Sequence, residues 1–310
     1  MDAGHTVSGV DNLNEAYDVR MKEHRLNLLR TYPGFCFYRL DISHREAMEG
    51  MFREHYERSK QPPFDAVINL AARAGVRLSQ TDPWVYMETN LTGTLNLLEL
   101  CRRYGIHKFG LASTSSVYGA DAPLPTPEEA DSSHPLQPYA ASKKGAEVLS
   151  YTYHFLYGID VTVFRYFTVY GPAARPDMVM FRFTQWISEA RPVIIYGDGE
   201  QTRGFTYLDD IARGTILGLK PLGYEVVNLG GHQVIKINEL ITMIENLTGM
   251  KAQVEYLPRH PADMFANWAN VDKAKQLLGW HPQVDLQKGV ANLVNWYNAE
   301  RSWASQIETN

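Results

Sequence analysis

The sequence lacks the features of secreted, membrane-spanning and nucleic-acid-binding proteins. Its 310 residues include only two cysteines, Cys36 and Cys101, far apart and in no metal-type spacing, so we expect reduced thiols, no disulfide framework and no metal site. No apolar run approaches the ~20 residues of a membrane span, and no charged-then-apolar leader pattern opens the chain. A net charge of −5 favours neither nucleic acid nor an anionic membrane surface as a partner. We therefore expect a cytoplasmic protein.

Short apolar runs alternate with helical patterns in the first half of the chain. Three runs are rich in β-branched and aromatic residues without polar alternation, as is typical of fully buried strands: 65–72, 107–113 and 161–167. Helices are expected at about 82–104 and 139–157, each followed by a glycine that ends it. This alternation predicts an α/β fold with a parallel sheet between two layers of helices.

The pattern loosens after about residue 170. We expect a first domain over residues 1–170 and a smaller, mixed α/β domain over 171–310, with some segments returning to the first. The second domain is expected at the carboxyl ends of the strands, where open parallel sheets bind ligands.

The strongest local signal is the segment YAASK, Tyr139 to Lys143. Residues i and i+4 share one face of a helix, so the phenol and the ammonium can meet. A nearby cation lowers the pKa of a phenol, which would allow Tyr139 to act as a general base near neutral pH. The same spacing is also met by chance, in which case the two residues are an ordinary surface pair.

Four consecutive hydroxyl residues, Ser113 to Ser116, follow the run 107–113. They stand at the carboxyl end of an expected strand, where a hydroxylic substrate would be held. The alternative is a polar turn rich in serine and threonine.

These residues belong to an ordered series of motifs: VDNLN, VINLAARAGVR, NLTGTLNLLE, ASTSSVYG, YAASKK, FRYFTVYGPAARPDM, GEQTRGFTYLDD and WANVDKAKQLLGW. Over essentially the whole chain, the series resembles the extended short-chain dehydrogenases that act as NAD-dependent nucleotide-sugar epimerases and dehydratases. The segments DNLNEAYDVRMKEHRL and YGPAARPDMVMFRFT are most similar to the UDP-glucuronate 4-epimerases. The resemblance implies a Rossmann-like doubly wound sheet, NAD as cofactor, a UDP-sugar as substrate and a homodimer through helices at about 82–104 and 139–157.

The resemblance also implies the catalytic roles. Tyr139 would take the proton of the sugar 4-hydroxyl, and Thr114 would hydrogen-bond that hydroxyl. Lys143 would bind the nicotinamide ribose and lower the pKa of Tyr139. Hydride would leave C4 for NAD and return to the other face of a 4-keto sugar.

Two sets of binding residues follow from the same resemblance. Contacts to NAD would come from Asp11, Asn12, Asp41, Ile42, Leu70, Ala71, Ala72, Asn90, Ser113, Tyr139 and Lys143. Among these, Asp11 would accept both adenosine ribose hydroxyls. Contacts to the UDP-sugar would come from Thr114, Ser115, Ser116, Thr168, Arg175, Ile194, Tyr196, Arg203 and Asp263. Arg203 would hold the phosphates and Asp263 the UDP ribose, although either could be an ordinary surface charge.

The identity of the sugar is argued from the positions after Thr114. In the families that the chain resembles, dehydratases carry Asp-Glu at these two positions, and decarboxylases carry a glutamate at the second. This chain has Ser115 and Ser116 there instead. These hydroxyls, with Thr168 and Arg175, could hold a C5 carboxylate. We therefore expect conversion of UDP-glucuronate to UDP-galacturonate, with 4-epimerisation of UDP-glucose or a UDP-N-acetylhexosamine as the alternative.

The family's glycine fingerprint for the cofactor pyrophosphate is missing. Thr6 to Val10 reads as the second strand of the expected sheet, and Gly4 reads as the end of a preceding helix. Without the first strand we expect two exposed strand edges, and without the glycines weakened NAD binding. Two hypotheses are open: a longer reading frame that encodes an active epimerase, or a non-catalytic protein that retains a UDP-sugar pocket.

Overall fold

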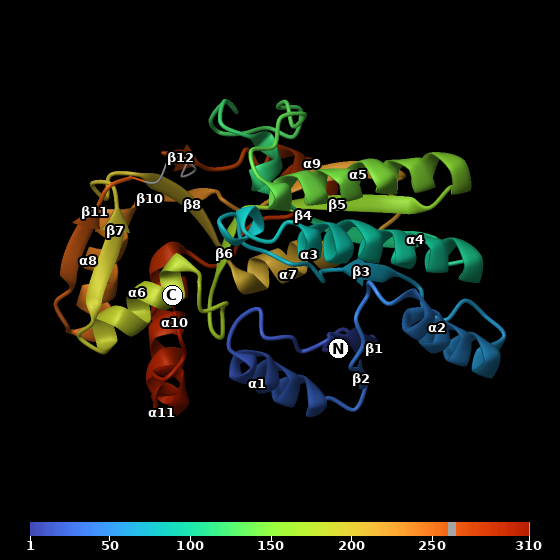
Figure 1. Cartoon of the computed structure of the whole chain (residues 1–310), viewed down its shortest axis with the longest axis horizontal. Coiled ribbons are helices and arrows are strands. Elements are labelled where there is room, and N and C mark those ends of the chain that lie inside the picture. Colours follow the sequence, from blue (N-terminus) through green and yellow to red (C-terminus); the bar gives the residue numbers. More distant parts are fainter. Residues whose placement is uncertain (260–264, 310) are drawn as a thin grey trace.

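A four-stranded parallel sheet forms the centre of the computed structural model, which describes residues 1–259 and 265–309 (Figure 1). Its order is β3-β4-β5-β9. The strands are β3 (Val67–Asn69), β4 (Lys108–Thr114), β5 (Asp160–Tyr166) and β9 (Tyr224–Leu229). The predicted strands are confirmed, but β3 is shorter than the run 65–72. Because β9 comes from the second half of the chain, the central sheet is completed by a segment that returns from there.

Helices cover both faces of this sheet. On one face α2 (Arg45–Ser59), α4 (Gly93–Tyr104) and α5 (Pro138–Tyr157) pack against inward side chains such as Val161 and Val163. On the other face α7 (Leu208–Leu217) and α9 (Asp272–Leu278) pack against Phe164 and Val227. Gly105 and Gly158 end α4 and α5 with left-handed backbones, as the sequence predicted.

The expected helix at 82–104 is not continuous. It consists of α3 (Trp84–Tyr86), a π-helical segment at Met87–Thr92 and α4. The π-helical segment surrounds Asn90, whose amide bonds to two neighbouring segments as described below.

Most of the second half of the chain, apart from α7, α9 and β9, forms the left part of Figure 1. One sheet has the order β10-β8-β12, with β6 also paired to β8, and a second consists of β11 and β7. Their strands are β6 (Thr168–Tyr170), β7 (Pro192–Tyr196), β8 (Thr202–Tyr207), β10 (Gln233–Lys236), β11 (Gln253–Leu257) and β12 (Ala266–Asn267). The helices beside them are α6 (Val179–Ser188), α8 (Ile237–Thr248), α10 (Leu286–Ala299) and α11 (Arg301–Ala304). A shared apolar core joins these sheets and helices.

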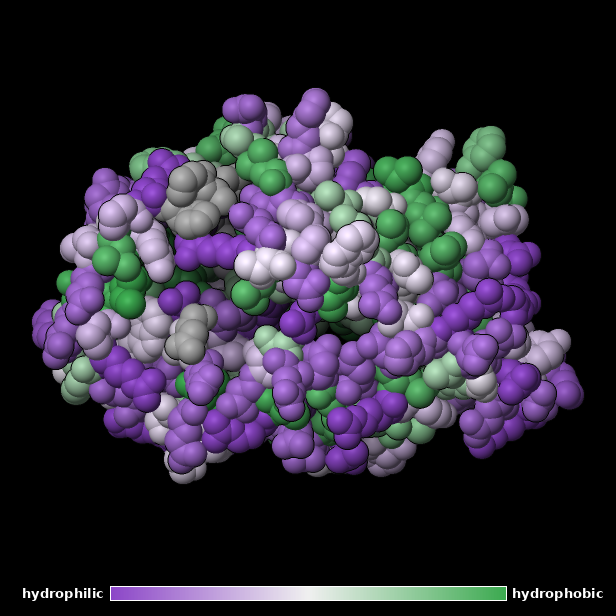
Figure 2. All heavy atoms as spheres, viewed as in Figure 1, coloured by the Kyte–Doolittle hydropathy of each residue, from purple (hydrophilic) through white to green (hydrophobic). Residues whose placement is uncertain are grey.

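The first two strands stand apart from the central sheet. β1 (Val7–Val10) pairs in parallel only with β2 (Phe35–Tyr38), and within residues 1–259 and 265–309 no strand pairs with the free edge of β1 or of β3. Val7 and Ile68, on these two strands, are 39% and 37% exposed. The two exposed edges predicted from the sequence are therefore present, and Figure 2 shows a hollow in the same part of the molecule.

The β1–β2 unit is anchored by its helix rather than by the sheet. Met21 on α1 (Val19–Arg30) is fully buried with Phe181, Tyr297 and Ile307 from the second half of the chain. The unit therefore keeps a defined place although neither of its strands pairs with the central sheet.

Two features are absent from the described part of the chain. None of its helices combines the length and apolar character needed to cross a bilayer. Nor do His, Cys, Asp and Glu side chains gather there in a group of three that could hold a metal ion.

Candidate active site

The centre of the site lies where β4 ends and α5 begins. Thr114 is the last residue of β4, and its hydroxyl accepts a hydrogen bond from the Ser116 backbone N–H at 3.2 Å, which starts the short 3₁₀ turn Ser115–Tyr118. Pro138 occupies the first turn of α5, where its missing N–H costs nothing. Tyr139 and Lys143 follow one turn apart on that helix. The structure thus brings Thr114, Tyr139 and Lys143 together, as predicted.

The pKa values of the tyrosine and lysine differ from expectation. Burial raises the pKa of Tyr139, while the Thr114 hydroxyl and the Arg175 guanidinium favour the phenolate and act against that rise. The predicted effect of Lys143 on the pKa of Tyr139 stays a prediction. Burial lowers the pKa of Lys143 itself to about 8, and the charge of Glu147 opposes that shift.

A buried ion pair beneath the catalytic residues was not predicted. Glu147, one turn beyond Lys143 on α5, receives two hydrogen bonds from Arg165 on β5, at 3.0 Å from Nε and 2.8 Å from Nη2. The two side chains are only 2% and 5% exposed. The Ser113 hydroxyl also donates to Glu147. This network fastens α5 to β4 and β5 and uses the Ser113 hydroxyl proton, and the cofactor contact expected of Ser113 stays a prediction.

Four predicted substrate residues surround the same strand end. Ser115 and Ser116 form the 3₁₀ turn, and Thr168 begins β6. Arg175 donates to Asp177 at 3.0 Å while its charge reaches Tyr139. The Thr114 hydroxyl and the Arg175 charge therefore act on Tyr139, Ser116 lies 3.3 Å from the Thr114 hydroxyl, and no carboxylate occupies the two positions after Thr114.

A hollow also lies in the second half of the chain, between the end of β7 and the start of β8. Its volume is about 250 Å³, and it is lined by Tyr196, Gly197, Asp198, Gln201, Arg203, Arg259 and Phe265. Tyr196 and Arg203 were predicted to contact the nucleotide, and Ile194 stands two residues before Tyr196 on β7. The predicted Asp263 lies outside the described residues.

Sequence reasoning missed two arginines of this hollow. Arg259 lines the wall, and the guanidinium of Arg77 lies 4.6 Å from the centre of the Tyr196 ring. Arg77 belongs to the motif AGVR, and its distance from Tyr196 along the chain hid the contact. Arg203 and Arg259 outnumber the one acid of the lining, Asp198, so the hollow has a positive character that suits a diphosphate.

The residues predicted for the adenosine end of NAD lie along β1 and β2. The Asp11 carboxylate follows β1, accepts from the Leu13 backbone N–H at 2.6 Å and lies 3.3 Å from the Lys22 ammonium. Asp41 accepts from Asn12 at 2.6 Å; burial favours a higher pKa for Asp41, but hydrogen bonds from Ser43 and Asn12 outweigh it and hold the pKa below its ordinary value. Both carboxylates are charged acceptors suited to ribose and adenine donors.

The other predicted cofactor residues are divided between surface and core. Leu70 is 61% exposed beyond β3, Ala71 and Ala72 are partly buried beside it, and the Ile42 side chain is buried in the core. Asn90 donates to the Arg73 backbone oxygen at 3.0 Å and to Ser142 at 2.9 Å. It thereby ties the segment after β3 to α5.

The described residues thus fit the two ends of NAD but not its middle. Tyr139, Lys143 and Thr114 are placed for the nicotinamide end, and Asp11 and Asp41 for the adenosine end. Between them the sheet is open at the edges of β1 and β3, and no glycine-rich turn followed by a helix stands there within the described chain. Backbone N–H groups for the pyrophosphate are not supplied by these residues.

Comparisons with known proteins agree with this geometry. The model of the NAD dependent epimerase/dehydratase family matches residues 1–230. A UDP-glucuronate 4-epimerase of Thermodesulfobacterium geofontis is 55% identical over 294 residues, covering 94% of this chain and 88% of the relative.

Two solved structures are similar over the whole fold. The Bacillus cereus UDP-glucuronic acid 4-epimerase in complex with UDP-glucuronic acid and NAD has a TM-score of 0.87 and 33% identity, covering 96% of this chain and 93% of that one. The Thermotoga maritima UDP-glucose 4-epimerase with UDP-glucose has a TM-score of 0.87 and 32% identity, covering 97% and 93%. With the family model matching residues 1–230 and a relative 55% identical over 94% of its length, the chain belongs to the NAD-dependent epimerase/dehydratase family.

Proposed function

We propose that the protein interconverts UDP-glucuronate and UDP-galacturonate by transient oxidation at C4. The observation that carries this proposal is the set of hydroxyls and one guanidinium, from Ser115, Ser116, Thr168 and Arg175, with no acid at the two positions after Thr114. The guanidinium pairs with Asp177 in this structure, and a uronate carboxylate would be a second anion for it. Hydroxyl donors and a cation of this kind would bind the C5 carboxylate of the sugar in its charged form. The 55% identity to a UDP-glucuronate 4-epimerase supports the same choice.

The chain's own residues manage the proton at O4. Tyr139 in its phenolate form takes the proton of the 4-hydroxyl and later returns it to the epimeric oxygen. Thr114 and Arg175 make this possible because both favour the phenolate against the burial of Tyr139. Lys143, charged below its pKa of about 8, is placed to donate to the ribose hydroxyls at the nicotinamide end. NAD, when bound, accepts the hydride of C4 and gives it back.

We further infer that NAD binds weakly to a polypeptide of these 310 residues alone. Its two ends have carboxylate, phenol and ammonium partners, but the open edge between β1 and β3 offers nothing to the pyrophosphate. A polypeptide extended before Met1 by a strand, a Gly-x-x-Gly-x-x-Gly turn and a helix, here termed the extended form, is expected to bind NAD more tightly.

The test is product formation from UDP-glucuronate, followed by proton NMR, with the 310-residue chain and the extended form at saturating NAD. We expect UDP-galacturonate from the extended form and little or none from UDP-glucose. If only UDP-glucose gives a product, the substrate is a neutral UDP-sugar and the proposal of a uronate is wrong. If the extended form binds a UDP-sugar and converts none, the protein is a binding protein rather than an epimerase.

A second copy of the chain is the partner that we propose for the outer face of α5. Val148, Tyr151, Phe155 and Leu156 are 57%, 51%, 74% and 58% exposed, and Trp84 of α3 is 80% exposed. Hydrophobic side chains gather over this end of the molecule (Figure 2). Light scattering should give a dimer, and Phe155→Glu should shift it to a monomer; a monomeric parent chain would contradict the proposal.

A further inference from the structure

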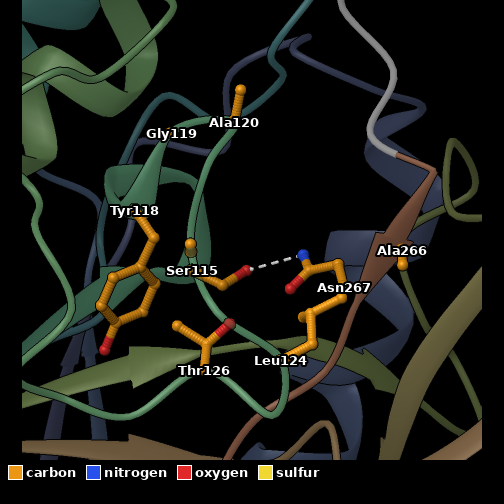
Figure 3. Close-up of a pocket in the computed structure, with 9 residues that line it drawn as sticks. Ser115, Tyr118, Gly119, Ala120, Leu124, Thr126, Ala266 and Asn267 are labelled. Carbon is orange, nitrogen blue, oxygen red and sulfur yellow. Dashed lines mark hydrogen bonds between the residues drawn. The ribbon is translucent and has the colours of Figure 1, made fainter.

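Two hydrogen bonds between described residues join the second half of the chain to the turn that follows Thr114: Tyr118 donates to Asn228 at 2.6 Å, and Asn267 reaches Ser115. Asn267, on β12, donates from Nδ2 to the hydroxyl oxygen of Ser115 at 3.2 Å (Figure 3). Ser115 is only 7% exposed. Among the described residues, its hydroxyl proton has no hydrogen-bond acceptor. Since a serine hydroxyl has one proton to donate, the amide of Asn267 leaves that proton available for an acceptor outside the protein.

The strand that carries Asn267 is held from both sides. Asn267 lies opposite Arg203 in the β12–β8 register, and Arg203 donates to the Phe265 backbone oxygen at 3.1 Å. Beyond it, the Thr126 backbone N–H donates to the Trp268 oxygen at 2.9 Å. A short stretch therefore connects the arginine of the nucleotide hollow with the hydroxyl beside Tyr139.

The space behind Ser115 does not suit a sugar. The cavity shown in Figure 3 has a volume of about 20 Å³ and is bounded by the turn after Ser115 and by β12. This is room for about one water molecule. A carboxylate that meets Ser115 would therefore have to approach from outside this cavity.

We propose that Asn267 is a positioning residue for substrate specificity: by donating to Ser115, it directs the serine proton towards the carboxylate of a uronate. The proposal rests on the proposed function, because it assigns the acceptor outside the protein to the C5 carboxylate. A neutral hydroxymethyl group can both donate and accept, so it gains much less from a hydroxyl that is oriented as a donor.

The decisive variant is Asn267→Asp, which keeps the shape but presents only acceptor oxygens. The Ser115 proton would then bond to residue 267, and a second negative charge would face the carboxylate. We expect the affinity for UDP-glucuronate to fall about 10- to 100-fold, in line with the loss of one hydrogen bond to a charged group. The affinities for UDP-glucose and for UDP should change about twofold or less, since neither carries the carboxylate that Ser115 serves.

Asn270→Asp is the matched control. It makes the same chemical change three residues along the chain, where the Asn270 side-chain oxygen already accepts from the Asp272 backbone N–H at 2.8 Å. An aspartate can accept the same bond, so this variant should leave all three affinities unchanged. Asn267→Ala, which frees the Ser115 hydroxyl to rotate, serves as the second variant if Asn267→Asp does not fold.

The measurement is calorimetric titration of the 310-residue chain with UDP, UDP-glucose and UDP-glucuronate. A selective loss of UDP-glucuronate binding in the Asn267 variants supports the proposal. An equal loss of all three ligands, or an unchanged preference for the uronate, overturns it and assigns Asn267 a structural role only. If the parent chain itself shows no preference for UDP-glucuronate over UDP-glucose, the proposed function fails as well, so the two failures are distinguishable.

Discussion

The inner strand β4, where the catalytic end of the site lies, and the open edge at β3 are held in place very differently. At the catalytic end, β4 has partners on both sides, and the Glu147–Arg165 pair fastens it to α5 and β5. At the open edge, β3 has one partner and β1 belongs to a separate two-stranded sheet. The residues that would handle the substrate proton thus do not depend on the open edge. We therefore expect substrate recognition and cofactor retention to be separable in this chain.

The largest effect is expected from a substitution of Tyr139. If the catalytic end works as described, Tyr139→Phe should lower the epimerisation rate of the extended form about 1,000-fold, the range expected for loss of a general base. The affinity for UDP-glucuronate should hardly change. Tyr86→Phe is the control, because the Tyr86 hydroxyl donates to the backbone oxygens of Ala74 and Gly75 at 3.2 and 3.0 Å. A Tyr139→Phe variant within tenfold of the parent rate would remove the tyrosine from the chemistry.

The buried ion pair gives the next largest effect. Glu147→Gln leaves the Arg165 guanidinium buried and unpaired, so the free energy of unfolding should fall by about 3–5 kcal/mol. The same change at Glu54, which pairs with Arg58 on the surface of α2, should cost about 0–1 kcal/mol. Urea unfolding monitored by circular dichroism measures both. Equal effects would mean that the pair at the catalytic end is no more than a surface contact.

A matched pair of leucine substitutions compares the two regions directly. Leu111, in the middle of β4, is fully buried, whereas Leu70 beside the open edge is 61% exposed. Leu111→Ala should lower the free energy of unfolding by about 2–5 kcal/mol. Leu70→Ala should change it by about 0.5 kcal/mol or less. A large loss at Leu70 in the 310-residue chain would show that the open edge is covered in solution.

Burial of the Lys143 ammonium should lower the free energy of unfolding by an amount that depends on pH. Its pKa is about 8 in the folded protein and about 10.4 in an unfolded chain, so the unfolded state binds more protons between these values. Stability of the parent therefore rises with pH across this window. Lys143→Met should be more stable than the parent by about 1–3 kcal/mol near pH 7, and the gap should close towards pH 10. A gap that is independent of pH, in unfolding curves taken from pH 6 to 10, would contradict a charged, buried Lys143.

Much of the fold could be predicted because its signals are local. Gly105 and Gly158 end helices through their own backbone conformations, and buried strands show as short apolar runs. The length of β3 could not be predicted, because it depends on whether a neighbour pairs with its outer edge. The π-helical segment around Asn90 was also hidden, since that side chain bonds to Arg73 and Ser142, which are distant along the chain.

The parts of the candidate site that follow from the residues themselves are local. Tyr139 and Lys143 share a helix face, and Ser113 to Ser116 stand at a strand end, whereas the role of Thr114 and the distant residues Asp11, Arg175 and Arg203 were expected only from the family resemblance. Arg165 and Asn267 were missed because each acts on a side chain that only the fold brings close. The raised pKa of Tyr139 was missed for a related reason, because burial is a property of the whole packed site.

The central claim is that these 310 residues form the substrate half of the site and leave the cofactor half open. Its most direct test is calorimetric titration of the same preparation with UDP-glucuronate and, separately, with NAD. We predict clear binding of UDP-glucuronate and NAD binding at least about 100-fold weaker, a difference of about 2.7 kcal/mol. NAD binding as tight as that of the sugar nucleotide would contradict the account, because the open edge would then hold the pyrophosphate.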